Sequence, residues 1–182
     1  MADSTRRSRR GPDTGGDRLT LTDCGSFAKV LVKGEGAAAV GFGAARRDGQ
    51  GRLVVGRGPA EWLVLGRPET ATATISDWDP PAGVDETTGR FVSLVDFTSA
   101  RALVRLAGTA APAVLAKLCA VDLARLQPGQ AVRTALARIA ADVIRDDDGS
   151  YLVAYERSYA DYLVDVLADA GAEFGLQRRE EP

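Results

Sequence analysis

Histidine is absent from the 182 residues of this chain, and cysteine occurs only twice. Without an imidazole, the chain cannot build a histidine–carboxylate relay, a histidine general base or a histidine-ligated metal centre. Two cysteines alone also fall short of a zinc ligand set. Catalysis by lysine, tyrosine or carboxylates remains open, as does the binding of a flavin or a pterin. The residue types therefore narrow the possible chemistry without deciding it.

Lysine and long apolar runs are also scarce. Only Lys29, Lys33 and Lys117 accompany the arginines, and no stretch approaches the ~18 consecutive apolar residues of a membrane helix. The net charge of −2 and the isoelectric point near 5.3 give no indication of nucleic-acid binding. No apolar signal-peptide core follows the arginine-rich start, so we expect a cytoplasmic protein in which Cys24 and Cys119 are free thiols.

The composition, with 45% hydrophobic and 26% charged residues, is that of a globular protein, and its changes along the chain suggest four segments. Residues 1–18 are rich in Arg, Ser, Gly and Asp and are expected to form a disordered basic tail. Residues 19–90 are expected to form an N-terminal β-rich subdomain that ends in a linker. Residues 91–176 are expected to form a C-terminal subdomain, and residues 177–182 a second tail.

Turn residues in the N-terminal part predict a β-hairpin. Leu53–Val55 and Trp62–Leu65 are short apolar runs on either side of Gly56–Ala60, which has the composition of a turn. Trp62 is expected in the core, with a partner-binding anchor as the alternative. Residues 67–90 contain a Pro-Pro pair and show no helical periodicity, so we interpret them as an irregular connection.

The C-terminal part has the clearer periodicity, which predicts the element order β-β-α-β-β-α. The strand over 134–145 is expected to be continuous, the Asp146–Gly149 segment to close a hairpin, and Ser158 to cap the last helix. Helices interleaved with hairpins predict an α+β fold in two subdomains, with antiparallel sheets and helices packed on one face. The elements are expected near residues 92–97, 102–106, 109–118, 134–145, 151–156 and 159–170.

Three short motifs resemble known sites, and each has a plainer interpretation. Gly34–Ala39 matches the G-x-G-x-x-A form of the dinucleotide fingerprint, but two further glycines interrupt the helix such a site needs, so a loop is favoured. The aspartates 146–148 resemble the opening of a calcium loop, but Arg157 stands where the bidentate Glu is needed, so a hairpin turn is favoured. Cys119 is expected to be a small buried hydrophobe. We therefore predict no catalytic, cofactor-binding or metal-binding residue.

The junction Glu156-Arg157-Ser158 lies between a strand and a helix, where exposed side chains can reach a partner. Arg157 is a candidate interface or anion contact, and we group it with Tyr159 and Trp62 as candidate partner-interface residues. The alternative is that Ser158 caps the helix and that both neighbouring charges are solvated.

Seven stretches follow one another in an order and at a spacing that resemble one protein family, the gamma subunit of heterotetrameric sarcosine oxidase. The stretches are Gly58–Leu63, Val95–Ala102, Val104–Gly108, Val114–Leu123, Thr134–Ile144, Glu156–Tyr159 and Ala172–Gly175. The resemblance implies a fold related to the folate-binding aminomethyltransferases of the glycine cleavage system. It also implies a helix between Gly66 and Phe91, although this chain is short there.

The resemblance implies a non-catalytic chain that assembles with alpha, beta and delta subunits. In such complexes sarcosine is oxidatively demethylated to glycine, and FAD, FMN, NAD and tetrahydrofolate are implied on the other subunits. The segment Gly149–Glu156 lacks the Gly-Glu-x-Gly-Tyr-Glu pattern of the folate site, so no folate residue is carried over. The chain is then expected to bury a partner interface well above ~1,000 Å².

Two alternatives make different structural predictions. A free-standing folate- or one-carbon-binding protein of the aminomethyltransferase superfamily predicts an enclosed pocket lined by carboxylates and aromatic side chains. A Rossmann-type cofactor protein built on Gly34–Ala39 predicts a parallel sheet, which the hairpin signals oppose.

Overall fold

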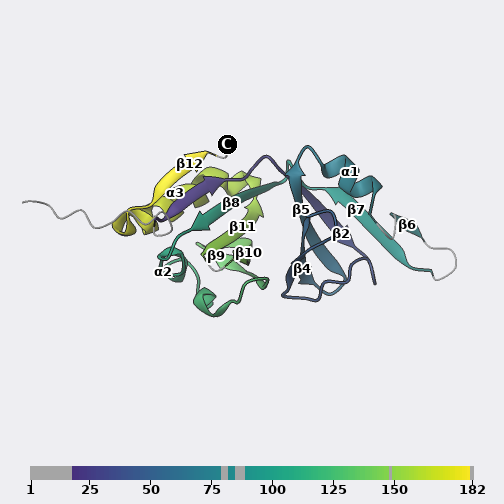
Figure 1. The fold of residues 1–182 in the computed structure, drawn as a ribbon, viewed down its shortest axis with the longest axis horizontal. Helices are drawn as coiled ribbons and strands as arrows, with labels where there is room; N and C mark the ends of the chain where they lie inside the picture. The colour runs from purple at the N-terminus through teal and green to yellow at the C-terminus, as the bar shows by residue number, and fades with distance from the viewer. Residues whose placement is uncertain (1–17, 79–81, 85–88, 148, 181–182) are drawn as a thin grey trace, which may run out of the picture.

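Two six-stranded sheets lie side by side in the computed structural model, which describes residues 18–78, 82–84, 89–147 and 149–180 (Figure 1). The N-terminal sheet has the order β3 (Ala45–Arg47), β4 (Leu53–Gly58), β5 (Glu61–Pro68), β2 (Phe27–Lys33), β7 (Phe91–Asp96) and β6 (Gly83–Val84). The C-terminal sheet has the order β12 (Gln177–Glu180), β1 (Thr20–Asp23), β8 (Arg101–Ala107), β11 (Ser150–Glu156), β10 (Ile139–Asp147) and β9 (Ala131–Leu136).

The chain passes between the sheets twice, after β1 and again after β7. β1 lies between β8 and β12, so the first strand belongs to the C-terminal sheet, whereas β7 pairs with β2 in the N-terminal sheet. Each sheet thus takes one strand from the other half of the chain. The division at residue 90 remains a prediction about folding units. Residues 177–180 of the expected C-terminal tail form β12, and residues 1–17 of the expected N-terminal tail lie outside the described residues.

Helices cover the outer faces of the two sheets. Helices α2 (Ala111–Ala116) and α3 (Ala160–Gly171) pack on the C-terminal sheet, and α1 (Ala71–Ser76) packs on the N-terminal sheet (Figure 1). The α+β fold with antiparallel pairing is confirmed, although β1 and β12 pair in parallel. Among the described residues, no helix has the length and apolar character needed to cross a membrane.

The prediction of one continuous strand over 134–145 is wrong. β9 and β10 are antiparallel and are joined by Ala137 and Arg138, whose φ angles are 49° and 68°. These left-handed conformations are usually taken by glycine or asparagine. Neither glycine nor asparagine is present here. The alternation of apolar and polar residues therefore continues through the turn, and the sequence gives no sign that the strand ends.

Two other expectations about helices need correction. The segment 67–90 is not wholly irregular, since α1 forms within it; six residues are too few to show periodicity, and Ala71 and Thr74 are its buried residues. Ser158 does not cap the last helix, because Arg157–Tyr159 form a 3-10 turn and Tyr159 occupies the N-cap of α3. The amphipathic pattern of α3 itself is confirmed, with Leu163, Leu167 and Ala170 buried.

The two sheets are held together by apolar side chains that pack between them and by a buried ion network. Asp142 on β10 lies 3.1 Å from Arg57 Nε and 2.7 Å from Arg101 Nη2, and its side chain is 3% exposed. Arg57 belongs to β4 of one sheet and Arg101 to β8 of the other, so the carboxylate joins both sheets. Arg57 Nη1 also lies 3.0 Å from Glu61 Oε1. The apolar side chains between the sheets are those of Leu53, Val55, Leu63, Leu65, Leu103, Ile144, Leu152 and Ala154.

We expect the substitution Asp142→Ala to lower the free energy of unfolding by about 3–5 kcal/mol, because it leaves two buried guanidinium groups without their shared carboxylate. Urea denaturation measures the change. The matched control is Asp122→Ala, which removes a pair with Arg125 whose side chains are 62% and 87% exposed, and should cost no more than about 0.5 kcal/mol. Equal, small losses for both variants would show that the network does not hold the sheets together.

Candidate functional site

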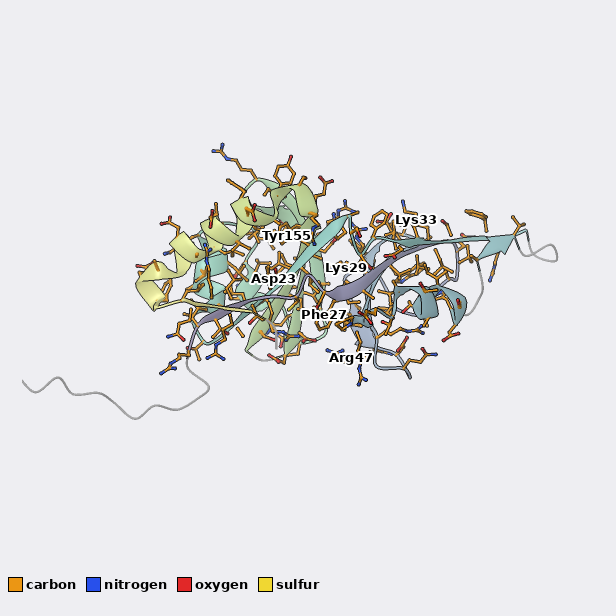
Figure 2. All side chains as sticks on the ribbon, turned by 90° about the horizontal axis from the view of Figure 1, so that it is seen from above. Asp23, Phe27, Lys29, Lys33, Arg47 and Tyr155 are labelled. Atoms are coloured by element: carbon orange, nitrogen blue, oxygen red, sulfur yellow. The ribbon has the colours of Figure 1, made fainter. Side chains whose placement is uncertain are left out.

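A buried amine holds the first crossing between the sheets. Lys29 has no exposed surface, and its Nζ donates to the carbonyl oxygens of Gly25 at 2.8 Å and Phe27 at 2.7 Å. Figure 2 shows Asp23, Phe27 and Lys29 in succession where the chain leaves one sheet for the other. With its donors engaged by backbone carbonyls and no open surface, this lysine serves the fold and is not accessible to a substrate.

Burial, and to a smaller extent the nearby Arg157 guanidinium, lower the pKa of Lys29 from 10.5 to about 8. Asp23, Cys24 and Asp96 act in the opposite direction, but they do not restore the usual value. The folded protein therefore holds this proton less tightly than the unfolded chain does.

Since the unfolded chain keeps the ordinary pKa, it binds more protons than the folded protein between pH 8 and 10.5. We therefore expect the free energy of unfolding to rise with pH across this window, by a Lys29 contribution on the order of 3 kcal/mol. Chemical denaturation at several pH values measures the slope. The variant Lys29→Met should lose this slope while retaining the contributions of all other groups. Identical slopes in both proteins would contradict the assignment.

Two tryptophans hold the glycine-rich loop that follows β2. Trp62 Nε1 donates to the Val40 carbonyl at 2.6 Å, and Trp78 Nε1 donates to the Ala37 carbonyl at 2.8 Å. The Gly34–Ala39 segment forms turns and bends, so the loop interpretation of this motif is confirmed. No described helix begins there to receive a pyrophosphate, and the sheet contains antiparallel pairs, so the Rossmann-type alternative is wrong.

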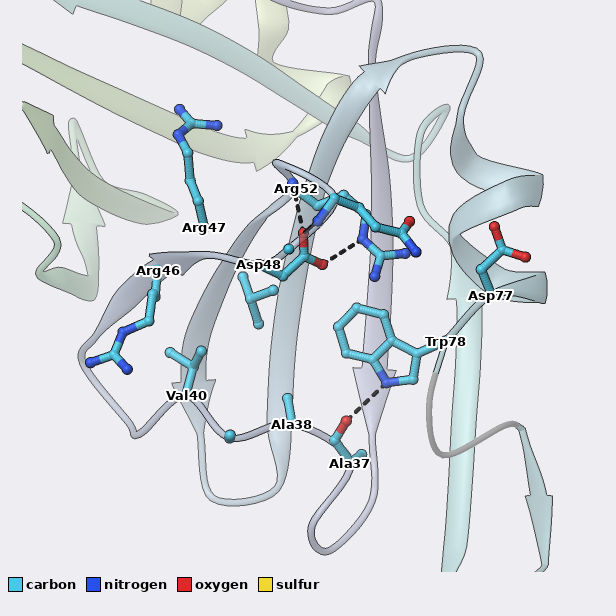
Figure 3. Close-up of a pocket in the computed structure, with 13 residues that line it drawn as sticks. Ala37, Ala38, Val40, Arg46, Arg47, Asp48, Arg52, Asp77 and Trp78 are labelled. Atoms are coloured by element: carbon cyan, nitrogen blue, oxygen red, sulfur yellow. Dashed lines mark hydrogen bonds and ion pairs between the residues drawn. The ribbon is translucent and has the colours of Figure 1, made fainter.

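An open cavity of about 470 Å³ lies beside this loop, as Figure 3 shows. Its walls are the loop residues 37–40, the Trp78 indole and the turn that joins β3 to β4. Arg52 spans the floor: its Nε lies 2.6 Å from Asp48 Oδ2, and its guanidinium lies 5.1 Å from the centre of the Trp78 ring. This cavity could not be predicted from the sequence, because Trp78 and Ala37 are 41 residues apart and no local sequence pattern indicates that they are in contact.

Asp48 is the carboxylate most deeply engaged in the cavity. Burial would raise the pKa of Asp48, but hydrogen bonds from the Arg52 side chain and from the backbone amides of Arg52 and Gln50 lower it below its usual value. A carboxylate held in its charged form does not donate a proton near neutral pH. The cavity therefore has the chemistry of a binding surface rather than of an acid catalyst.

The structure brings two of the three candidate interface residues together at the start of α3. Tyr159 is 46% exposed and, with the 49% exposed Tyr162, lines an open cavity of about 410 Å³. Arg157 is exposed two residues away and lines a separate groove of about 460 Å³. Trp62 is only 6% exposed and packs in the core of the other sheet, as first expected, and not at the surface as a partner-binding anchor requires.

The remaining motifs have structural explanations. Cys24 and Cys119 are free thiols; Cys24 is buried, whereas Cys119 is half-buried rather than fully buried. Asp146 and Asp147 end β10 and lead into the predicted hairpin, while Asp148 lies outside the described residues. The described ranges contain no group of three or more side chains suited to a metal ion.

A sarcosine oxidase subunit gamma from Corynebacterium sp. (strain P-1) is 31% identical to this chain over 149 residues, which cover 78% of this chain and 70% of the relative. The chain belongs to the sarcosine oxidase gamma subunit family. No family model matches the sequence.

Solved structures show the fold expected of this gamma-family chain. A chain of the heterotetrameric sarcosine oxidase from Corynebacterium sp. U-96, in complex with pyrrole 2-carboxylate, is similar with a TM-score of 0.70 and 21% identity, over 91% of this chain and 96% of that chain. The glycine cleavage system aminomethyltransferase T from Bartonella henselae is similar with a TM-score of 0.67 and 14% identity, over 89% of this chain and 48% of that chain. The aminomethyltransferase-like fold is therefore confirmed.

Tetrahydrofolate, the ligand that the resemblance associates with this fold, does not fit between the two sheets of the gamma-family chain. The apolar side chains described above fill that space, and the buried Asp142 network joins the two sheets across it. Residues 150–155 of β11 are buried on both faces, so their side chains pack into the two cores instead of facing a ligand.

Proposed function

We propose that this chain is the non-catalytic gamma subunit of a heterotetrameric sarcosine oxidase, a flavoprotein that oxidatively demethylates sarcosine to glycine. The 31% identity to a sarcosine oxidase gamma subunit over most of the chain carries the proposal. Its partners are the alpha, beta and delta subunits, which hold FAD, FMN, NAD and tetrahydrofolate. We place the complex in the cytoplasm, because both cysteines of this chain are free thiols.

The arrangement of polar groups supports a structural role. The buried amine of Lys29 is engaged by backbone carbonyls, and the Asp142 carboxylate is engaged by two arginines. The sequence contains no histidine to act as a base. The polar groups most protected from water are thus committed to the fold, and the exposed ones lie on open surfaces suited to contact with other chains.

The groove beside Arg157 favours one alternative enough to test it. Two carboxylates, Asp23 and Asp161, line this groove together with Tyr155. Burial raises the pKa of Tyr155 to about 12, so its hydroxyl keeps its proton at neutral pH. A free-standing folate- or one-carbon-binding protein predicts such carboxylates and aromatic side chains, but in an enclosed pocket, whereas this site is an open groove. Calorimetric titration of the isolated chain with tetrahydrofolate separates the two functions, because stoichiometric binding would favour the alternative.

The start of α3 is the surface that we assign to a partner subunit. Tyrosine and arginine are enriched at the energetic centres of protein interfaces, where an aromatic ring supplies area and a polar end. Here Tyr159, at the N-cap of α3, and Tyr162, in its first turn, line one cavity with Arg138 and Glu156, and Arg157 adds an exposed guanidinium. Such a patch fits a contact with an apolar centre and a charged rim.

We expect the double variant Tyr159→Ala with Tyr162→Ala to reduce recovery of this chain with co-expressed alpha, beta and delta subunits by about tenfold or more, since truncated interface tyrosines commonly cost that much affinity. Affinity purification through a tag on the alpha subunit measures recovery, and sarcosine-dependent turnover confirms that the complex is assembled. The double variant with Phe at both positions keeps the rings and should be recovered like the wild type.

Arg125→Ala serves as a control for an exposed arginine elsewhere, because its side chain is 87% exposed on another part of the surface. Recovery of the alanine double variant at the wild-type level would remove the start of α3 from the interface. Failure of the wild-type chain to join the complex would overturn the proposed function itself.

A further inference from the structure

Phe42 is the most exposed large apolar side chain among the described residues, at 73%. It lies in the loop that links β2 to β3, two residues after Val40, which lines the cavity of Figure 3. A single exposed phenylalanine is not unusual on a protein surface. What distinguishes Phe42 is the rigidity of the backbone that carries it.

The backbone on both sides of Phe42 is fixed to the N-terminal sheet. Before it, the Val40 carbonyl accepts the Trp62 indole N–H; after it, the Gly43 amide donates to the Gly56 carbonyl at 3.0 Å. A Cβ on Gly56 would lie 2.2 Å from the Gly41 oxygen, so the loop lies directly on β4. Phe42 is therefore held in solvent on an ordered backbone, which reduces the entropy lost when a partner binds it.

The cavity lies on the same face of the sheet as Phe42. Val54 lines the cavity, and Gly56, which supports the Phe42 loop, is two residues further along β4, so both face the same side. The cavity wall is largely apolar where Ala38, Val40 and Val54 meet the Trp78 ring. An exposed aromatic side chain, Phe42, thus lies next to an apolar cavity. Such a pair is typical of the centre of a protein–protein interface.

The rim of the cavity carries one exposed guanidinium group that makes no ion pair within the described residues. This group belongs to Arg46, whereas the Arg52 guanidinium is held by Asp48 and its Nη1 is buried without an acceptor. Asp48 is already engaged by Arg52, which leaves Asp77 as the remaining carboxylate of the lining. Arg47 is paired with Asp146 but is still 56% exposed. An incoming carboxylate therefore finds one unpaired guanidinium group at this rim, that of Arg46.

We infer that Phe42 and the adjoining cavity form a second docking surface, which binds an acidic segment of a partner subunit that inserts an apolar side chain beside Trp78. This inference rests on the proposed function, and it adds a surface on the N-terminal sheet to the one at the start of α3. Phe42 packs against the partner, the partner's apolar side chain fills the cavity, and Arg46 pairs with its carboxylate.

A competition experiment tests the surface in the assembled complex. The wild-type chain and one variant are produced together with the alpha, beta and delta subunits, and intact mass spectrometry gives their ratio in the purified complex. We expect Phe42→Ala to be depleted by about tenfold relative to the wild type. Arg46→Glu should be depleted more than Arg46→Gln, because only the former repels an acidic partner. Val121→Ala, at a residue 39% exposed elsewhere, is the control and should be incorporated equally.

The outcomes of this competition experiment separate the docking surface from the proposed function. Equal incorporation of Phe42→Ala and the wild type, with the wild type present in the complex, overturns this surface and leaves the proposed function standing. Equal incorporation of Arg46→Glu and Arg46→Gln overturns the acidic character of the partner segment. Absence of the wild type from the complex overturns the proposed function and this inference with it. Sedimentation of the isolated chain completes the test, since a dimer that Phe42→Ala dissociates would show that a second copy is the occupant.

Discussion

One buried carboxylate determines how the two sheets meet. Asp142 stands between Arg57 of the N-terminal sheet and Arg101 of the C-terminal sheet, so a single negative charge is shared by two positive ones from opposite sides of the interface. Burial lowers the pKa of Arg101, while Asp142 opposes that effect. Sliding or opening the sheets would separate Arg57 from Asp142, and breaking a buried ion pair costs more than losing an exposed one. The apolar layer beside the network keeps its register for this reason.

The same packing leaves no room for a ligand between the sheets. In a fold shared with an aminomethyltransferase, the region between the sheets is filled by leucine, valine and isoleucine side chains. The two surfaces that we propose for contact with other subunits lie on the outside: the exposed tyrosines at the start of α3, beside the C-terminal sheet, and the Phe42 loop on the N-terminal sheet. Both sites stand on ordered backbone, so the internal rigidity that excludes a ligand also positions the contact surfaces.

Features set by local sequence could be predicted, and those set by distant contacts could not. The β4–β5 hairpin, the amphipathic α3 and the Gly34–Ala39 loop follow from turn residues and periodicity, and the order of seven stretches indicated the family. The turn at Ala137 and Arg138 was not predicted, because it contains neither glycine nor asparagine. The Arg57–Asp142 contact spans 85 residues, and β12 becomes a strand only through its pairing with β1. Contacts between residues so far apart cannot be recognised from the pattern of a short sequence segment.

The position of β1 between β8 and β12 has a consequence for synthesis on the ribosome. All strands of the N-terminal sheet lie within residues 27–96, so that sheet can assemble while the rest of the chain is still being made. β1 emerges before any of them, yet its outer neighbour, Gln177–Glu180, appears only after all the other described strands. Until then one side of β1 is an unpaired edge that another strand can extend. A ribosome that stalls before residue 177 therefore holds a nascent chain with an open template for aggregation.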